Sequence, residues 1–72
     1  MKYVTETTAE KVEQGKQLIK GEGGSIGDKT FDISGVSGRY QFVEGTLTVV
    51  VDDMPFLATE SMIENKLNSF FS

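Results

Sequence analysis

The chain contains no cysteine, histidine or tryptophan, and only one proline. Without cysteine there can be no disulfide and no thiolate ligand for a metal, and the absence fits a reducing compartment. Without histidine, the chain also lacks the most versatile general base and the commonest ligand of transition metals. We therefore expect a protein that is not an enzyme and that holds no cofactor or metal.

Basic residues are few, with 7 Lys and Arg against 11 Asp and Glu and a net charge of −4 at pH 7. Nonspecific binding to nucleic acid needs clustered cations that displace counterions, so we expect no nucleic-acid partner. Lysines and glutamates are interleaved along residues 10–22, which is typical of a solvated helix face. The acidic balance leaves one further role open, that of an inhibitor or mimic that occupies a basic surface of a partner.

Long hydrophobic runs are also absent. No segment approaches the roughly 20 apolar residues of a membrane span, and residues 1–10 hold no apolar segment typical of a secretory signal. A length of 72 residues predicts a single domain over residues 1–72 with a compact core. We expect it to be cytoplasmic and not bound to a membrane.

The strongest pattern present is an alternation of apolar and polar residues in the runs 30–34, 37–43 and 46–53. This period is typical of strands with one buried and one solvated face. The runs are separated by short glycine-bearing turns, so they predict a three-stranded antiparallel meander with residues 39–43 in the middle strand.

The two predicted turns agree with this alternation. A two-residue loop at 44–45 pairs Phe42 with Leu47 and Tyr40 with Val49. A two-residue loop at 35–36 would place glycine at the first central position of a type II′ turn and would pair Phe31 with Tyr40. Both registers bring apolar residues together on one face of the sheet.

A first helix is predicted over residues 8–20, with Thr7 as its N-cap and Glu10 completing a capping box. Gly15 would let this helix lie close to the sheet. The glycine-rich stretch 21–29 reads as a flexible connector, because its glycine spacing fits neither a dinucleotide fingerprint nor a P-loop. The apolar stripe of the helix consists of Ala9, Val12, Leu18 and Ile19.

A second helix is predicted over residues 55–70, with Asp53 as its N-cap and Pro55 in its first turn. Apolar residues recur at helical spacing along it and predict a face that packs on the sheet. This stripe consists of Phe56, Ile63, Leu67 and Phe70.

These elements predict an α+β two-layer sandwich in which an antiparallel three-stranded meander is flanked by an N-terminal and a C-terminal helix. Residues 1–6 fit two interpretations, because Tyr3 and Val4 could add an edge strand or pack under the first helix. Carboxylates near the start of the second helix would provide a cation site only if they clustered. They are Asp52, Asp53, Glu60 and Glu64.

Residues 33–71 resemble the C-terminal part of a small bacterial family, the polyhydroxyalkanoic acid system proteins. The similarity lies in SGVSG at 34–38, the alternating apolar residues of 47–51, PFL at 55–57 and IENKL at 63–67. It implies a helix, a meander and a C-terminal helix. It also implies a role at a hydrophobic ligand or at a polyhydroxyalkanoate granule, and it carries over no catalytic residue.

Val43 and Val50 place apolar side chains on the predicted solvated face, and Phe71 follows Phe70 at the end of the second helix. Grouped exposed apolar residues mark interaction sites, and edge strands can pair with other chains. We therefore predict a non-enzymatic interaction domain that self-associates, with Val43, Val50 and Phe71 as candidate contact residues. The alternative is a binding protein for a hydrophobic ligand or granule surface, with its site between helix and sheet.

Overall fold

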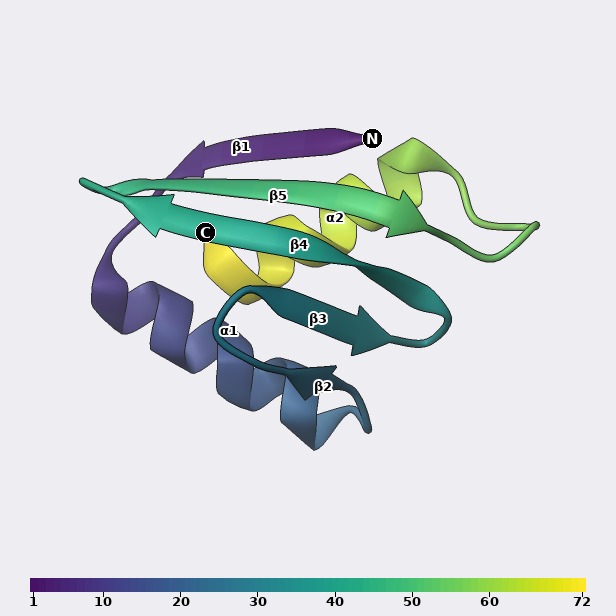
Figure 1. The fold of residues 1–72 in the computed structure, drawn as a ribbon, viewed down its shortest axis with the longest axis horizontal. Helices are drawn as coiled ribbons and strands as arrows, with labels where there is room; N and C mark the ends of the chain where they lie inside the picture. Colours follow the sequence, from purple (N-terminus) through teal and green to yellow (C-terminus); the bar gives the residue numbers. More distant parts are fainter.

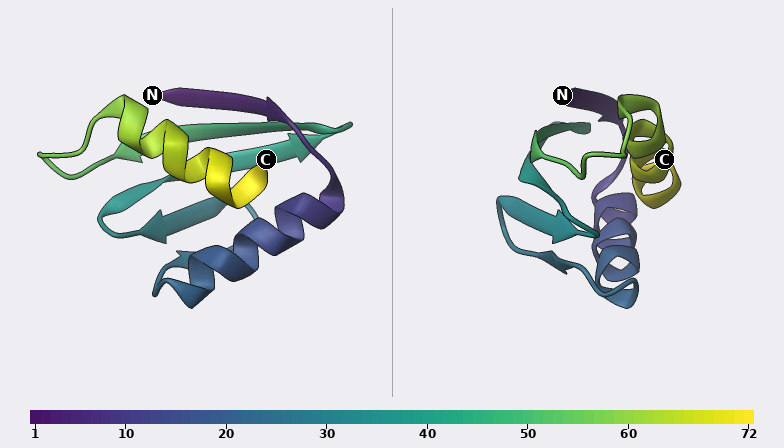
Figure 2. Two further views of the ribbon diagram at one scale, coloured as in Figure 1. Left: turned by 180° about the vertical axis from the view of Figure 1, so that it is seen from behind. Right: turned by 90° about the vertical axis from the view of Figure 1, so that its right-hand side faces the viewer.

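The structure is a computed structural model that describes all of Met1–Ser72. A five-stranded antiparallel sheet carries two helices on one face (Figures 1 and 2). Its strands are ordered β1-β5-β4-β3-β2. In chain order the elements are β1 (Lys2–Glu6), α1 (Ala9–Gly21), β2 (Ser25–Ile26), β3 (Thr30–Ile33), β4 (Val36–Val43), β5 (Thr46–Asp53) and α2 (Glu60–Phe71).

The α+β class is confirmed, but the three-stranded sheet is wrong. β1 extends the sheet beyond β5, so the edge-strand interpretation of residues 1–6 is correct. At the other edge, β2 arises inside the glycine-rich connector and pairs with β3. Ile26 lies opposite Phe31 and packs against the core, which gives this short strand an anchor.

The β4–β5 hairpin has the predicted register. Tyr40 faces Val49 and Phe42 faces Leu47. Glu44 and Gly45 have φ angles of 49° and 82°, so both central residues of the turn are left-handed, as a type I′ turn requires.

The β3–β4 turn lies one residue earlier than predicted. Ser34 and Gly35 occupy it, with φ angles of 53° and 82°, and Val36 begins β4 opposite Ile33. Phe31 consequently faces Gly38 and not Tyr40. The partner shifts by two residues, so every side chain stays on the predicted face. Val36 is β-branched and is better placed in a strand than at a turn.

Both helices are capped by a threonine other than the predicted residue. For α1 the cap is Thr8, whose hydroxyl accepts the Lys11 N–H at 3.2 Å. Thr7 instead donates its hydroxyl to the Phe71 carbonyl at 2.7 Å. The hydroxyl that was expected to cap α1 therefore ties the start of that helix to the end of α2.

The second helix begins five residues later than predicted, at Glu60. Its cap is Thr59, whose hydroxyl accepts the Met62 N–H at 3.2 Å. Asp53 cannot serve as the cap because it is the last residue of β5, where it pairs with Ser37. Residues 54–59 form a loop, called the Phe56 loop below.

The core lies between the sheet and the helices and contains no buried polar side chain. Two predicted stripe residues of α1, Ala9 and Leu18, are exposed, whereas Val12 and Ile19 are buried. Phe56, predicted to be core, is exposed. The buried hydrophobic residues are Tyr3, Val12, Ile19, Phe31, Ile33, Tyr40, Leu47, Val49, Val51, Ile63, Leu67, Phe70 and Phe71.

Gly15 permits a close approach, but the neighbour is α2 and not the sheet. A Cβ on Gly15 would lie 2.8 Å from the Phe70 carbonyl oxygen and would collide with the Phe71 ring. The ring of Phe71 therefore fills the space over Gly15 and becomes buried.

Candidate interaction surface

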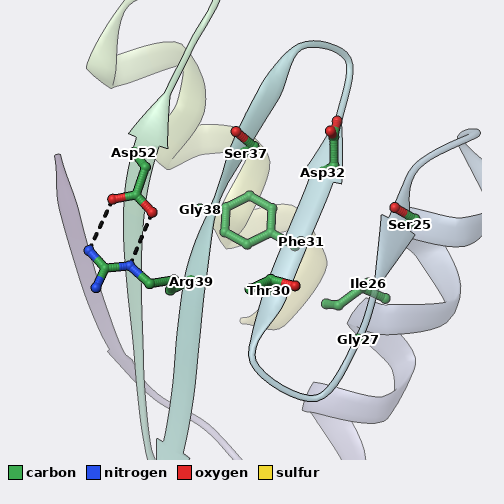
Figure 3. Close-up of a pocket in the computed structure, with 10 residues that line it drawn as sticks. All are labelled: Ser25, Ile26, Gly27, Thr30, Phe31, Asp32, Ser37, Gly38, Arg39 and Asp52. Carbon is green, nitrogen blue, oxygen red and sulfur yellow. Dashed lines mark hydrogen bonds and ion pairs between the residues drawn. The ribbon is translucent and has the colours of Figure 1, made fainter.

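One depression is polar and lies on the sheet face that the helices leave open. Figure 3 shows Arg39 and Asp52 facing each other at its side, from β4 and β5. Arg39 donates from Nε to Asp52 Oδ2 and from Nη2 to Asp52 Oδ1, each at 3.0 Å. These hydrogen bonds to Asp52 raise the pKa of the Arg39 guanidinium. Arg39 thus directs two of its five N–H donors at a carboxylate of its own chain, so its charge is paired within the sheet.

The carboxylates predicted to cluster near the start of α2, which are Asp52, Asp53, Glu60 and Glu64, form no group of three or more. Asp52 is engaged by Arg39, Asp53 ends β5, and Glu60 opens α2 on the far side of the Phe56 loop. No group of three or more His, Cys, Asp or Glu side chains is placed to hold a metal ion.

Another depression is an apolar groove between α2 and the β3–β4 hairpin. Its volume is about 380 Å³ and hydrophobic side chains make up most of its wall. Lys66 also lines the groove, and its ammonium group is 2.9 Å from a carboxylate oxygen of Glu22. The groove is formed chiefly by Ile33, Val36, Leu57, Ala58, Met62 and Ile63.

The Phe56 loop forms one end of the groove and displays its two largest side chains. The Ala58 N–H donates to the Pro55 carbonyl at 3.0 Å, so Phe56 and Leu57 occupy the central positions of a turn. Phe56 is 99% exposed and Leu57 is 83% exposed. Both side chains therefore project from the loop while their backbone is held by a hydrogen bond.

The loop is anchored on both sides of this turn. Met54 and Ala58 pack against the core. Pro55 lies against the β3–β4 turn, where a Cβ on Gly35 would be 3.1 Å from Pro55 Cγ. A loop fixed at both ends presents its exposed side chains with a smaller entropic cost of ordering on binding.

The contact residues predicted from the sequence lie outside the apolar groove and the Phe56 loop. Val43, 49% exposed, and half-buried Val50 lie on the open face of the sheet, so their role in contacts stays a prediction. Phe71 is 3% exposed because its ring packs over Gly15, so it presents little surface, and its contact role also stays a prediction. None of these three residues lines the apolar groove.

Comparison of the chain with protein-family models, curated proteins and solved structures finds no match in any of the three. The similarity of residues 33–71 to the polyhydroxyalkanoic acid system family therefore stays a prediction. Neither helix of the structure has the length and hydrophobicity needed to cross a bilayer.

Proposed function

We propose that this chain is a small, non-enzymatic interaction domain that binds an apolar segment of a partner protein at the Phe56 loop and the adjoining groove. One observation carries the proposal: an anchored turn holds Phe56 and Leu57 in solvent beside a groove that the chain leaves unfilled. Exposed apolar patches of this kind mark interaction sites, and protruding aromatic residues commonly provide most of the binding energy.

The chemistry of the surface supports binding and not catalysis. The groove contains one charged side chain, Lys66, whose ammonium group is held in an ion pair by Glu22, a residue outside the groove lining. Its remaining wall offers apolar contacts, whose contribution scales with the area removed from water.

A second candidate is the binding of a hydrophobic small molecule in the same groove. The volume of about 380 Å³ lies within the usual range for small-molecule pockets. The family resemblance implies the same chemistry, that of a hydrophobic ligand or a polymer granule. The two candidates share a surface and differ in what must fill it.

Binding of the fluorescent apolar probe anilinonaphthalene sulfonate to the native protein tests the surface itself. We expect its fluorescence to rise with the wild-type protein and to rise much less with Phe56→Ser or Met62→Ser. Val43→Thr is the matched control, because it removes an exposed apolar side chain from the open sheet face. Equal binding by all three variants would contradict the proposed site.

Peptides selected from a random display library then separate the two candidates. A protein-binding domain should select peptides with a shared apolar motif that displace the probe from the groove. Displacement by a medium-chain fatty acid such as decanoate, with no peptide selected, would favour the hydrophobic-ligand function.

A further inference from the structure

The first strand leaves one side of its backbone unpaired. The Val51 N–H donates to the Met1 carbonyl at 2.8 Å, and the Thr7 N–H donates to the Gly45 carbonyl at 2.9 Å. Main-chain groups in an antiparallel pair alternate between the two sides of a strand. The odd-numbered residues of this segment therefore bond to β5, and the N–H and C=O groups of Lys2, Val4 and Glu6 point away from the sheet.

The side chains of these three residues are exposed on the open face of the sheet. Val4 is 55% exposed. Lys2 and Glu6 form no ion pair within the chain, whose ion pairs join other residues. Nothing lies alongside β1 on its outer side in Figure 1. The edge thus offers unpaired backbone groups, one apolar side chain and two charges of opposite sign.

The order of these residues is self-complementary. We propose that two copies of this chain pair through β1 in antiparallel fashion, about a two-fold axis at Val4, and so join their sheets into one. In this register Val4 faces Val4 of the second copy, and Lys2 faces its Glu6. Because of the two-fold symmetry, the Lys2–Glu6 pair occurs twice, once at each end of the interface.

The backbone geometry is consistent with this register and excludes a slip by one residue. Lys2, Val4 and Glu6 are the residues whose main-chain groups are free, and each would face one of these three residues of the second copy. Each facing pair would exchange two backbone hydrogen bonds, as in any hydrogen-bonded antiparallel pair. A slip of one residue would set these groups opposite groups already bonded to β5.

The inner side of the strand does not oppose this pairing. Two residues at the C-terminal end of α2 contact β1 side chains: Asn68 accepts the Tyr3 hydroxyl, and the C-cap Ser72 lies 3.5 Å from the Thr5 hydroxyl. The side chains of both residues are uncharged, so these two contacts add no like charges when two copies meet at this edge.

The opposite edge of the sheet cannot pair in this way. β2 consists of Ser25 and Ile26 alone and has a glycine on each side. Very short edge strands are a recognised means of preventing edge-to-edge association. Pairing is therefore confined to β1. Because each chain has only this one edge to pair, association stops at a dimer and does not continue into a fibre.

Charge reversal tests both the dimer and its register. Analytical ultracentrifugation of the wild-type protein up to about 1 mM should show a monomer–dimer equilibrium, since interfaces of this small size are weak. Lys2→Glu alone and Glu6→Lys alone set like charges opposite each other at both ends of the interface. We expect each to weaken dimerisation by about tenfold or more.

An equimolar mixture of the two variants should associate again, because each Glu of one copy then faces a Lys of the other. Val4→Pro should also abolish dimerisation. It removes an N–H that points away from β5 and so leaves the intramolecular ladder intact. Thermal unfolding of each variant at low concentration confirms that the monomer remains folded.

Two results would overturn the dimer. One is a wild-type chain that stays monomeric at about 1 mM. The other is a dimer that survives both charge reversals and Val4→Pro, which would place its contact elsewhere. Phe56→Ser should leave dimerisation unchanged while it reduces probe binding, so the failure of the groove proposal and the failure of the β1 proposal give different results.

Discussion

Phe56 and Phe71 carry the same side chain in opposite environments. Phe56 is 99% exposed at the tip of an anchored turn, whereas Phe71 is 3% exposed at the end of α2. What separates them is the neighbour available to each ring: Phe71 has the bare backbone of Gly15 beside it, and Phe56 has solvent. The comparison teaches that burial in this small domain is set by partners distant in sequence, and not by the hydrophobicity of the segment.

The largest expected change in the free energy of unfolding comes from removing the buried ring of Phe71. Phe71→Ala should lower the free energy of unfolding by about 3–5 kcal/mol, the usual cost of truncating a buried aromatic side chain. Urea denaturation measures this loss. Phe71→Leu should shift the midpoint in the same direction by less, and it serves if the alanine variant does not fold. Phe56→Ala is the control, and equal losses at the two positions would contradict their opposite burial.

A smaller decrease in the free energy of unfolding is expected when the space occupied by the Phe71 ring is narrowed. Gly15→Ala introduces a methyl group against Phe71 and the Phe70 carbonyl, and overpacking costs about 1–3 kcal/mol. The better helix propensity of alanine offsets about 1 kcal/mol of it. Gly21→Ala is the matched control, because a Cβ there meets nothing within 4 Å. If both variants are equally stable, the helices are not in close contact at Gly15.

The start of α2 fixes which of the two phenylalanines belongs to the helix. Thr59→Ala should lower the free energy of unfolding by about 1 kcal/mol, because the Met62 N–H loses its acceptor. Asp53→Ala should have a much smaller effect, since Asp53 is exposed at the end of β5. The reverse order of effects in thermal or urea unfolding would indicate a helix that begins near Pro55 and includes Phe56.

The smallest change in stability is expected at the exposed ring. Phe56→Ser should alter the free energy of unfolding by no more than about 0.5 kcal/mol, as is usual for surface substitutions. The same variant should lose most of the native-state probe binding. A loss of several kcal/mol would instead mean that Phe56 packs against the domain.

Much of the fold could be predicted because local signals agreed. The turn at Glu44 and Gly45 and the alternation around it specify one register, which the structure confirms. The β3–β4 turn was misplaced, but strand periodicity kept each side chain on the correct face. β2 could not be predicted, since two residues within a glycine-rich stretch are too few to show alternation.

The interaction surface could not be predicted for a related reason. Asp53 and Pro55 imitate the start of a helix, and Phe56 lies seven residues before Ile63, a spacing that suits one helical face. Thr59 was the overlooked signal, because threonine is a preferred N-cap. Phe71 seemed free at the end of its helix because its partner, Gly15, lies far back in the chain.

The contact of Tyr3 with Asn68, across 65 residues, has a consequence for how the molecule is made. Contacts between segments so far apart form slowly, because closing a long loop costs entropy before the contact is gained. As the nascent chain leaves the ribosome, residues 2–6 have no neighbouring strand until β5 emerges, and Tyr3 has no acceptor until α2 follows. The first strand to be synthesised is therefore among the last to find its place.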